Sequence, residues 1–304
     1  MTHERSVELP SGVELCYDER GEGPPVVLVM GIGAQMILWP DGFCDALAAR
    51  GFRVVRFDHR DVGRSSHLHH LGVPPLGPTL MSSLVGMRVR APYALEDMAD
   101  DVAHLMDALG FADAHVVGAS MGGMIAQTMA FTHPHRVRSL VSMMSTTGKP
   151  GVLISEPRAL RALFGRAPRS KDEAVACSEA LFEVIRSTAF EHDREEVRRR
   201  AALAWDRGVN PRGFLRHLGA IGATGDRTAR LRFVRAPTLV VHGSVDPLIR
   251  PVGGHLTADA IEGARLELVE GMGHDLPRGA WPRLVELLAD HAEAADRSRE
   301  RSSR

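Results

Sequence analysis

Short runs rich in apolar residues alternate along this chain with segments in which apolar residues recur at every third or fourth position. The runs indicate strands within a sheet, and they occupy residues 26–30, 53–57, 114–117, 137–143, 238–242 and 265–269. Helical spacing is clearest over 95–109, and further helices are expected at 41–50, 124–131, 256–261 and 281–294. This alternation predicts an α/β fold with a doubly wound, mostly parallel sheet.

The alternation of strands and helices is interrupted once, after residue 147. From 148 to 235 the pattern is helical, with no segment that indicates a strand. We therefore predict a discontinuous core formed by residues 1–147 and 236–295, with a helical lid inserted at 148–235. The end of the chain, residues 296–304, is rich in charge, and we expect a disordered tail there.

The predicted strand 114–117 runs directly into Gly118-Ala119-Ser120-Met121-Gly122, and a helix follows. A strand, a tight Gly-x-Ser-x-Gly turn and a helix are typical of a nucleophile elbow. The turn needs glycines because side chains at Gly118 and Gly122 would collide with neighbouring backbone. It also aims the Met121 N–H at the space above Ser120, where an oxyanion would form. A glycine-rich turn that happens to contain a serine is the alternative.

A serine hydroxyl becomes an effective nucleophile only when a base lies within hydrogen-bond reach and an acid orients that base. Both groups are expected just after later strands, because ligand-binding groups gather at the carboxyl ends of parallel strands. Asp246 is the first acid after the strand 238–242, and His274 lies in a glycine-rich loop after the strand 265–269. The order Ser120, Asp246, His274 is the one expected after a nucleophile elbow.

Two alternatives concern the remaining histidines. His255, on or just before a helix, is the best substitute for His274 as base. The pattern His67-Leu68-His69-His70 could suggest zinc, but no matching cysteine or acidic cluster accompanies it. We expect a solvated loop there and no metal site.

A second oxyanion donor is expected from the loop that follows the strand 26–30. We assign it to the backbone N–H of Ile32, with Gly31 and Gly33 keeping the loop tight. A plain strand-to-helix turn is the alternative. The charged loop 58–65 follows the next strand, and we interpret it as structural rather than catalytic.

Composition narrows the classes of partner. The chain has 304 residues, of which 44% are hydrophobic, and this is enough for one large α/β domain with an inserted piece. A net charge of -1, without a long block of one sign, argues against nucleic acid or an anionic membrane surface as partner. Scattered cysteines, no signal sequence and no apolar stretch of membrane-spanning length lead us to expect a cytoplasmic protein. The sequence leaves the oligomeric state open.

These motifs resemble the α/β-hydrolase superfamily over about residues 24–147 and 236–294. Within that span, Val29-Met30-Gly31, Trp39-Pro40, the loop 57–65 and the elbow look like the aclacinomycin methylesterase group. Proteins of that group cleave a methyl ester from a polyketide and need no cofactor. The resemblance implies the same roles as those assigned above: Ser120 as nucleophile, Asp246 as acid, His274 as base, and Ile32 and Met121 as oxyanion donors.

We therefore predict a serine hydrolase that cleaves a carboxylic ester of a hydrophobic small molecule, a methyl ester included, through an acyl-enzyme. Apolar residues of the insert and of the irregular segment 66–93 suggest its pocket, and four are candidates for the lining: Met81, Leu84, Phe164 and Trp205. Packing of the insert against the core is the alternative for these side chains. The same scaffold can also support perhydrolysis, carbon–carbon bond hydrolysis, or a ligand receptor with slow turnover.

Overall fold

The computed structural model describes residues 4–75, 77–79, 86–87, 89–151 and 155–302. At its centre is an eight-stranded sheet with the order β1-β2-β4-β3-β5-β6-β7-β8. The strands are β1 (Arg5–Glu8), β2 (Glu14–Arg20), β3 (Pro25–Val29), β4 (Arg53–Phe57), β5 (Ala114–Ala119), β6 (Val137–Met143), β7 (Thr238–Gly243) and β8 (Arg265–Val269). β1 and β2 pair antiparallel with each other, as do β2 and β4, and every pair from β4 to β8 is parallel. The predicted mostly parallel sheet is confirmed.

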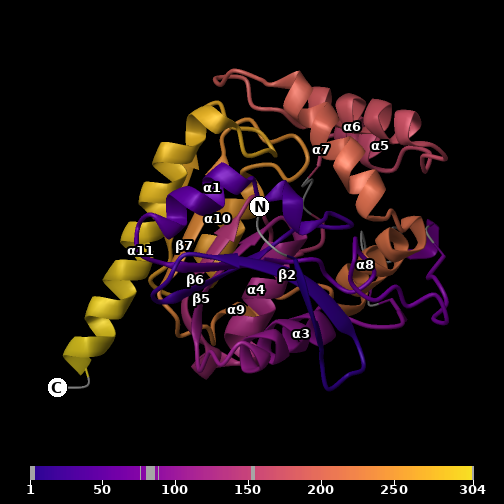
Figure 1. Ribbon diagram of the computed structural model, residues 1–304. Helices are drawn as coiled ribbons and strands as arrows, with labels where there is room; N and C mark the ends of the chain where they lie inside the picture. Colours follow the sequence, from indigo (N-terminus) through magenta and orange to yellow (C-terminus); the bar gives the residue numbers. More distant parts are fainter. Residues whose placement is uncertain (1–3, 76, 80–85, 88, 152–154, 303–304) are drawn as a thin grey trace.

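Helices cover both faces of the sheet because side chains alternate along the buried strands. On β3, Val27 and Val29 join the core beneath α3 (Leu95–Ala108) and α4 (Met121–Thr132). Val26 and Leu28 point to the opposite face, where they pack beneath α1 (Asp41–Ala48) and α11 (Trp281–Ser302). Figure 1 shows α11 on one side of the strands and α3 and α4 on the other. The sheet is therefore doubly wound, as predicted.

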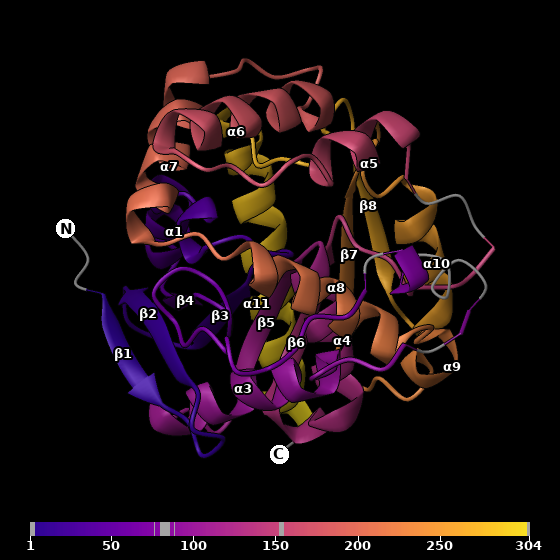
Figure 2. The same cartoon turned by 90° about the vertical axis from the view of Figure 1, so that its right-hand side faces the viewer.

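Further helices lie between β6 and β7, where the sequence predicts the insert. They are α5 (Pro157–Leu163), α6 (Lys171–Ile185), α7 (Arg194–Arg207), α8 (Pro211–Thr224) and α9 (Thr228–Leu231), and α10 (Val252–Ala260) follows β7. Figures 1 and 2 show α5, α6 and α7 together at one end of the molecule. Their interpretation as a lid remains a prediction.

We expected a disordered tail at 296–304. This expectation is wrong for residues 296–302, which form the last turns of α11. Its last turns bind the core: Arg299 donates to Asp113 at 2.5 Å, and Asp296 lies 3.6 Å from Arg138. Charges that look solvated in the sequence thus find partners on distant segments. Neither α11 nor any other helix in the described part of the chain is both long and apolar enough to cross a bilayer.

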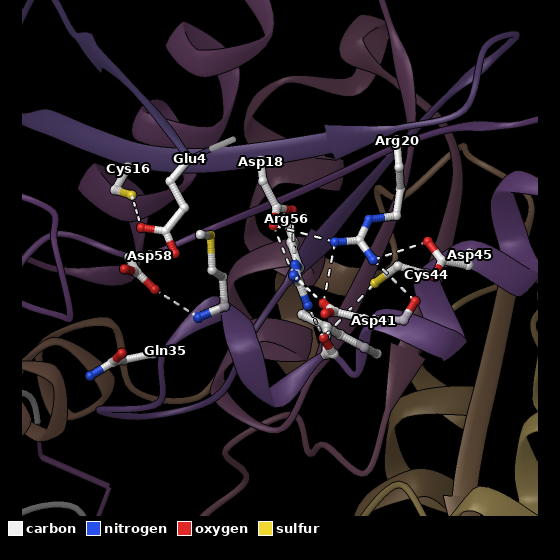
Figure 3. Close-up of polar contacts among 12 residues, drawn as sticks. Glu4, Cys16, Asp18, Arg20, Gln35, Asp41, Cys44, Asp45, Arg56 and Asp58 are labelled. Carbon is white, nitrogen blue, oxygen red and sulfur yellow. Dashed lines mark hydrogen bonds and ion pairs between the residues drawn. The ribbon is translucent and has the colours of Figure 1, made fainter. Parts of the chain in front are cut away.

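A buried charge network, shown in Figure 3, joins the N-terminal strands to α1. Arg56 of β4 is 3% exposed, and it donates to both carboxylate oxygens of Asp18 on β2, at 2.8 Å each. It also donates to Asp41 at the start of α1, at 2.5 Å, and to the carbonyl of Trp39. Because every guanidinium nitrogen of Arg56 has an acceptor, its charge can be buried at a tolerable cost.

Two buried carboxylates of the loop 58–65 anchor the inserted helices. Asp61 accepts from Arg216 of α8 at 2.7 Å, and both side chains are fully buried. Asp58 pairs with Arg207 at the end of α7. These contacts agree with the structural role expected for this loop, and they connect segments about 150 residues apart in sequence.

Breaking the Asp61–Arg216 pair should destabilise the protein strongly. Burial opposes the ionisation of Asp61, but the hydrogen bonds from Arg216 and the Leu68 N–H outweigh it and lower the pKa of its carboxyl. Arg216→Leu would leave that carboxylate buried without its counter-charge, so we expect the free energy of unfolding to fall by about 3–5 kcal/mol. Urea denaturation at pH 7 measures this change.

Arg198→Leu is the matched control, because Arg198 of α7 pairs with Glu179 while remaining 56% exposed. An exposed pair contributes at most about 1 kcal/mol. Equal losses for the two variants would contradict the anchoring role of Arg216.

Candidate active site

The turn between β5 and α4 holds Ser120 in a strained backbone conformation. Its φ is 57° and its ψ is -121°, in a region that non-glycine residues rarely occupy. A Cβ on Gly118 would lie 2.1 Å from the carbonyl oxygen of Gly122, and one on Gly122 would lie 2.0 Å from that of Val29. Only glycine fits at these two positions, which is the reason for the motif that the sequence shows.

Asp246 and His274, predicted as acid and base, are brought together. His274 Nδ1 donates to Asp246 Oδ2 at 2.6 Å. The other carboxylate oxygen accepts the N–H groups of Leu248 and Ile249, at 2.9 Å each, so the side chain of Asp246 is held in place and fully buried. Because this carboxylate accepts from Nδ1, the Nε2 atom of His274 is left as the basic nitrogen.

Ser120, Asp246 and His274 all lie at the same edge of the sheet. They follow the carboxyl ends of β5, β7 and β8, and these strands belong to one parallel series. The substitute base considered from the sequence, His255, is an exposed residue of α10 instead. In the described ranges, no three His, Cys, Asp or Glu side chains are gathered so that they could hold a metal ion.

The loop that carries His274 is fastened to the end of α6. The His274 N–H donates to the Ile185 carbonyl at 2.8 Å, and the Gly273 N–H donates to Ser187 Oγ at 2.9 Å. The Ser187 hydroxyl donates in turn to Asp275 at 2.5 Å. Asp275 therefore points toward the insert and not toward His274. No feature of the sequence around Ser187 indicates its contact with this loop.

The turn Gly31–Ala34 approaches the elbow closely. A Cβ on Gly31 would lie 3.2 Å from Ser120 Cβ and 3.5 Å from Ser120 Oγ. Ile32, the predicted oxyanion donor, is the next residue of this turn. Met121 is the first residue of α4, so its N–H has no acceptor within the helix and can bind an external anion.

Two buried histidines form hydrogen bonds with the backbone of this turn and of the residue before it. His59 donates from Nε2 to the Met30 carbonyl at 2.8 Å, and His217 Nδ1 accepts the Gly33 N–H at 3.1 Å. Burial lowers the pKa of His59 to about 3 and that of His217 to about 4. Both rings are therefore neutral at neutral pH. No local sequence signal marks His217, because it lies on α8 and is far from Gly33 along the chain.

The predicted pocket residues are only partly placed. Met81 and Leu84 lie outside the described residues. Phe164 packs edge-on against Phe214, with ring centroids 5.8 Å apart, and Phe214 covers Gly33, where a Cβ would lie 2.8 Å from its ring. Phe164 is thus linked to the turn next to Ser120. Trp205, near the end of α7, remains a predicted pocket residue.

Comparison with known proteins identifies the fold family. The family model described as "alpha/beta hydrolase fold" matches residues 24–277. The chain belongs to this family. Among solved structures, a meta-cleavage product hydrolase (CumD) from Pseudomonas fluorescens superposes on this α/β-hydrolase with a TM-score of 0.73. Its sequence is 22% identical, and the match covers 96% of this chain and 98% of the other.

Within the α/β-hydrolases, the chain is similar in sequence to two methylesterases. Rhodomycin D methylesterase DauP from a Streptomyces species is 28% identical over 89% of this chain and 91% of its own length. Rhodomycin D methylesterase DnrP from Streptomyces peucetius is 27% identical with the same coverage. The expected resemblance to the methylesterase group is confirmed, and hydrolase chemistry is supported.

We expect this α/β-hydrolase to lose stability in acid, because His59 and His217 are buried as neutral rings. In the unfolded chain a histidine protonates near pH 6.5, whereas His59 and His217 resist protonation until about pH 3 and 4. Between about pH 6.5 and 4 the unfolded state binds more protons, so the free energy of unfolding falls as the pH falls. His59→Gln keeps a donor for the Met30 carbonyl but cannot titrate. The free energy of unfolding of this variant should therefore fall less between pH 7 and pH 4 than that of wild type, by up to about 3 kcal/mol.

Urea denaturation of wild type and His59→Gln at a series of pH values checks this expectation, with each protein referred to its own stability at pH 7. Parallel pH profiles for the two proteins would rule out His59 as a source of the acid sensitivity.

Proposed function

We propose that the protein hydrolyses a carboxylic ester of a hydrophobic small molecule through an acyl-enzyme on Ser120. The observation that carries the proposal is the 2.6 Å hydrogen bond between His274 Nδ1 and buried Asp246, at the sheet edge where Ser120 occupies a strained turn. A carboxylate that binds one imidazole nitrogen fixes the tautomer and leaves the other nitrogen able to take a proton. This arrangement supports nucleophilic catalysis by the serine.

In the proposed reaction, Ser120 Oγ attacks the ester carbonyl carbon while His274 Nε2 takes the hydroxyl proton. The N–H groups of Ile32 and Met121 bind the resulting oxyanion. The bond between the acyl carbon and the alcohol oxygen then breaks, and the alcohol leaves with the proton from His274. Water attacks the acyl-enzyme with the same histidine as base, which releases the carboxylic acid and restores the serine.

Two observations support the proposed substrate class. Similarity to the rhodomycin D methylesterases supports a methyl ester. The aromatic pair Phe164 and Phe214 beside the turn supports an apolar group on the acyl side. Perhydrolysis, carbon–carbon bond hydrolysis and a receptor with slow turnover are the competing functions, and the substrate panel below separates them.

Ser120→Ala should abolish turnover, because no other group then attacks the carbonyl. In serine hydrolases, loss of the nucleophile lowers kcat by about 10⁶. We would measure hydrolysis of p-nitrophenyl acetate, butyrate and octanoate, and the mass added to the intact protein by a fluorophosphonate. Wild type should turn over the esters and gain one adduct, and Ser120→Ala should do neither.

Ser298→Ala is the control, because Ser298 lies near the end of α11 and its hydroxyl donates to the Ala294 carbonyl of its own helix. A labelled Ser120 without ester turnover would overturn ester hydrolysis. Turnover of a β-diketone or of peroxide would then identify the competing reaction, and tight ligand binding with neither would identify a receptor. A wild type that is not labelled at all would remove Ser120 as the nucleophile.

A further inference from the structure

The neutral ring of His217 connects the inserted helices to the turn beside Ser120. The side chain comes from α8 and is fully buried. Its Nδ1 atom lies 3.1 Å from the Gly33 backbone nitrogen, and its Nε2 atom lies 2.9 Å from the Arg60 carbonyl oxygen. Because the Gly33 N–H can only donate, Nδ1 must accept. The proton therefore resides on Nε2, which donates to Arg60.

The contact with Gly33 bears on the direction of the neighbouring Ile32 N–H. The Ile32 N–H belongs to the same planar peptide unit as the Gly31 carbonyl, and that carbonyl accepts from the Ala34 N–H at 3.3 Å. The next peptide unit contains the Gly33 N–H, which His217 holds. With both peptide units bonded, and with Gly33 at a φ of 61°, the direction of the Ile32 N–H is determined.

The surroundings keep this arrangement rigid. The ring of Phe214 covers Gly33, and the rings of His59 and Tyr93 meet His217 edge-on, at centroid distances of 5.9 Å and 6.3 Å. Burial, which lowers the pKa of His217 to about 4, keeps Nδ1 able to accept at neutral pH. A protonated ring would present N–H groups on both sides and could not bond the Gly33 N–H.

We propose that His217 is a positioning residue for the oxyanion hole: its Nδ1 atom binds the Gly33 N–H and thereby aims the Ile32 N–H at the oxyanion formed on Ser120. This inference rests on the proposed function, since it assigns His217 a part in the same reaction. The insert then contributes to the rate of the chemical step, in addition to any role in choosing the substrate.

Two isosteric substitutions separate this role from simple packing. His217→Asn places an amide oxygen near the position of Nδ1, so it can still accept the Gly33 N–H. His217→Gln places an amide nitrogen near the position of Nε2, so it can still donate to Arg60 but leaves Gly33 without its acceptor. Both variants remove the ring, and both should lower stability.

We expect His217→Gln to lower kcat for p-nitrophenyl butyrate about 10- to 100-fold, less than the factor of about 10²–10³ for loss of a donor, because the Ile32 N–H is misaimed and not removed. KM should change by less than about threefold, because the carbonyl of the unreacted ester makes only weak hydrogen bonds to the oxyanion donors. The inhibition constant of a trifluoromethyl ketone, which forms a hemiketal oxyanion on serine, should rise in parallel with the loss of kcat/KM. His217→Asn should recover most of both losses.

The matched control is His115 of β5, a buried histidine whose Nδ1 lies 2.9 Å from Ser139 Oγ at the opposite end of that strand from Ser120. His115→Gln and His115→Asn should lower stability without a change in kcat per labelled site, counted with a fluorophosphonate. Equal kcat values for the Asn and Gln variants of His217, in an active wild type, would overturn the positioning role and leave the proposed function intact. A wild type that hydrolyses no ester would instead overturn the proposed function, and the role of His217 with it.

Discussion

The contact between the backbones of β3, β5 and α4 is the constraint on which the rest of the site depends. Gly118 and Gly122 allow these backbones to meet at distances that any Cβ would prevent, since one at Gly122 would lie 2.0 Å from the Val29 carbonyl. That contact brings the strained Ser120, the first N–H of α4 and the turn after β3 to one place. The parallel order of β5 to β8 then puts Asp246 and His274 at the same edge. Two small residues therefore set the geometry in which the other groups can act.

The inserted helices are integrated into the core through buried polar contacts. Asp58 and Asp61 bind Arg207 and Arg216, and separating buried ion pairs of this kind is expensive because each charge would lose its partner away from water. Helices α7 and α8 are thus poorly suited to swing away from the core as a unit. The end of α6 adds a further attachment through the loop of His274. These attachments hold three of the inserted helices against the core.

The sequence was sufficient for elements whose signal is local. Each buried strand carries its own apolar run, and Asp246 and His274 follow their strands directly, so both the sheet and the arrangement at its edge could be predicted. Contacts between distant charges could not. The last turns of α11 contact distant residues, as Arg299 does with Asp113, whereas their charged sequence alone indicates a solvated tail. The contact of His217 with Gly33 could not be predicted either, because the two residues lie on different elements and no spacing rule connects them.

The proposed pocket and the turn beside Ser120 share one helix, α8. Phe214 packs on Gly33 and against Phe164, while His217, three residues further along α8, binds the N–H of the same glycine. Residues three apart lie on one face of a helix, so a change in the apolar side chains of α8 that shifts the helix also shifts the acceptor of the turn. A turn that aims a hydrogen-bond donor tolerates little displacement, because catalytic stabilisation depends steeply on alignment.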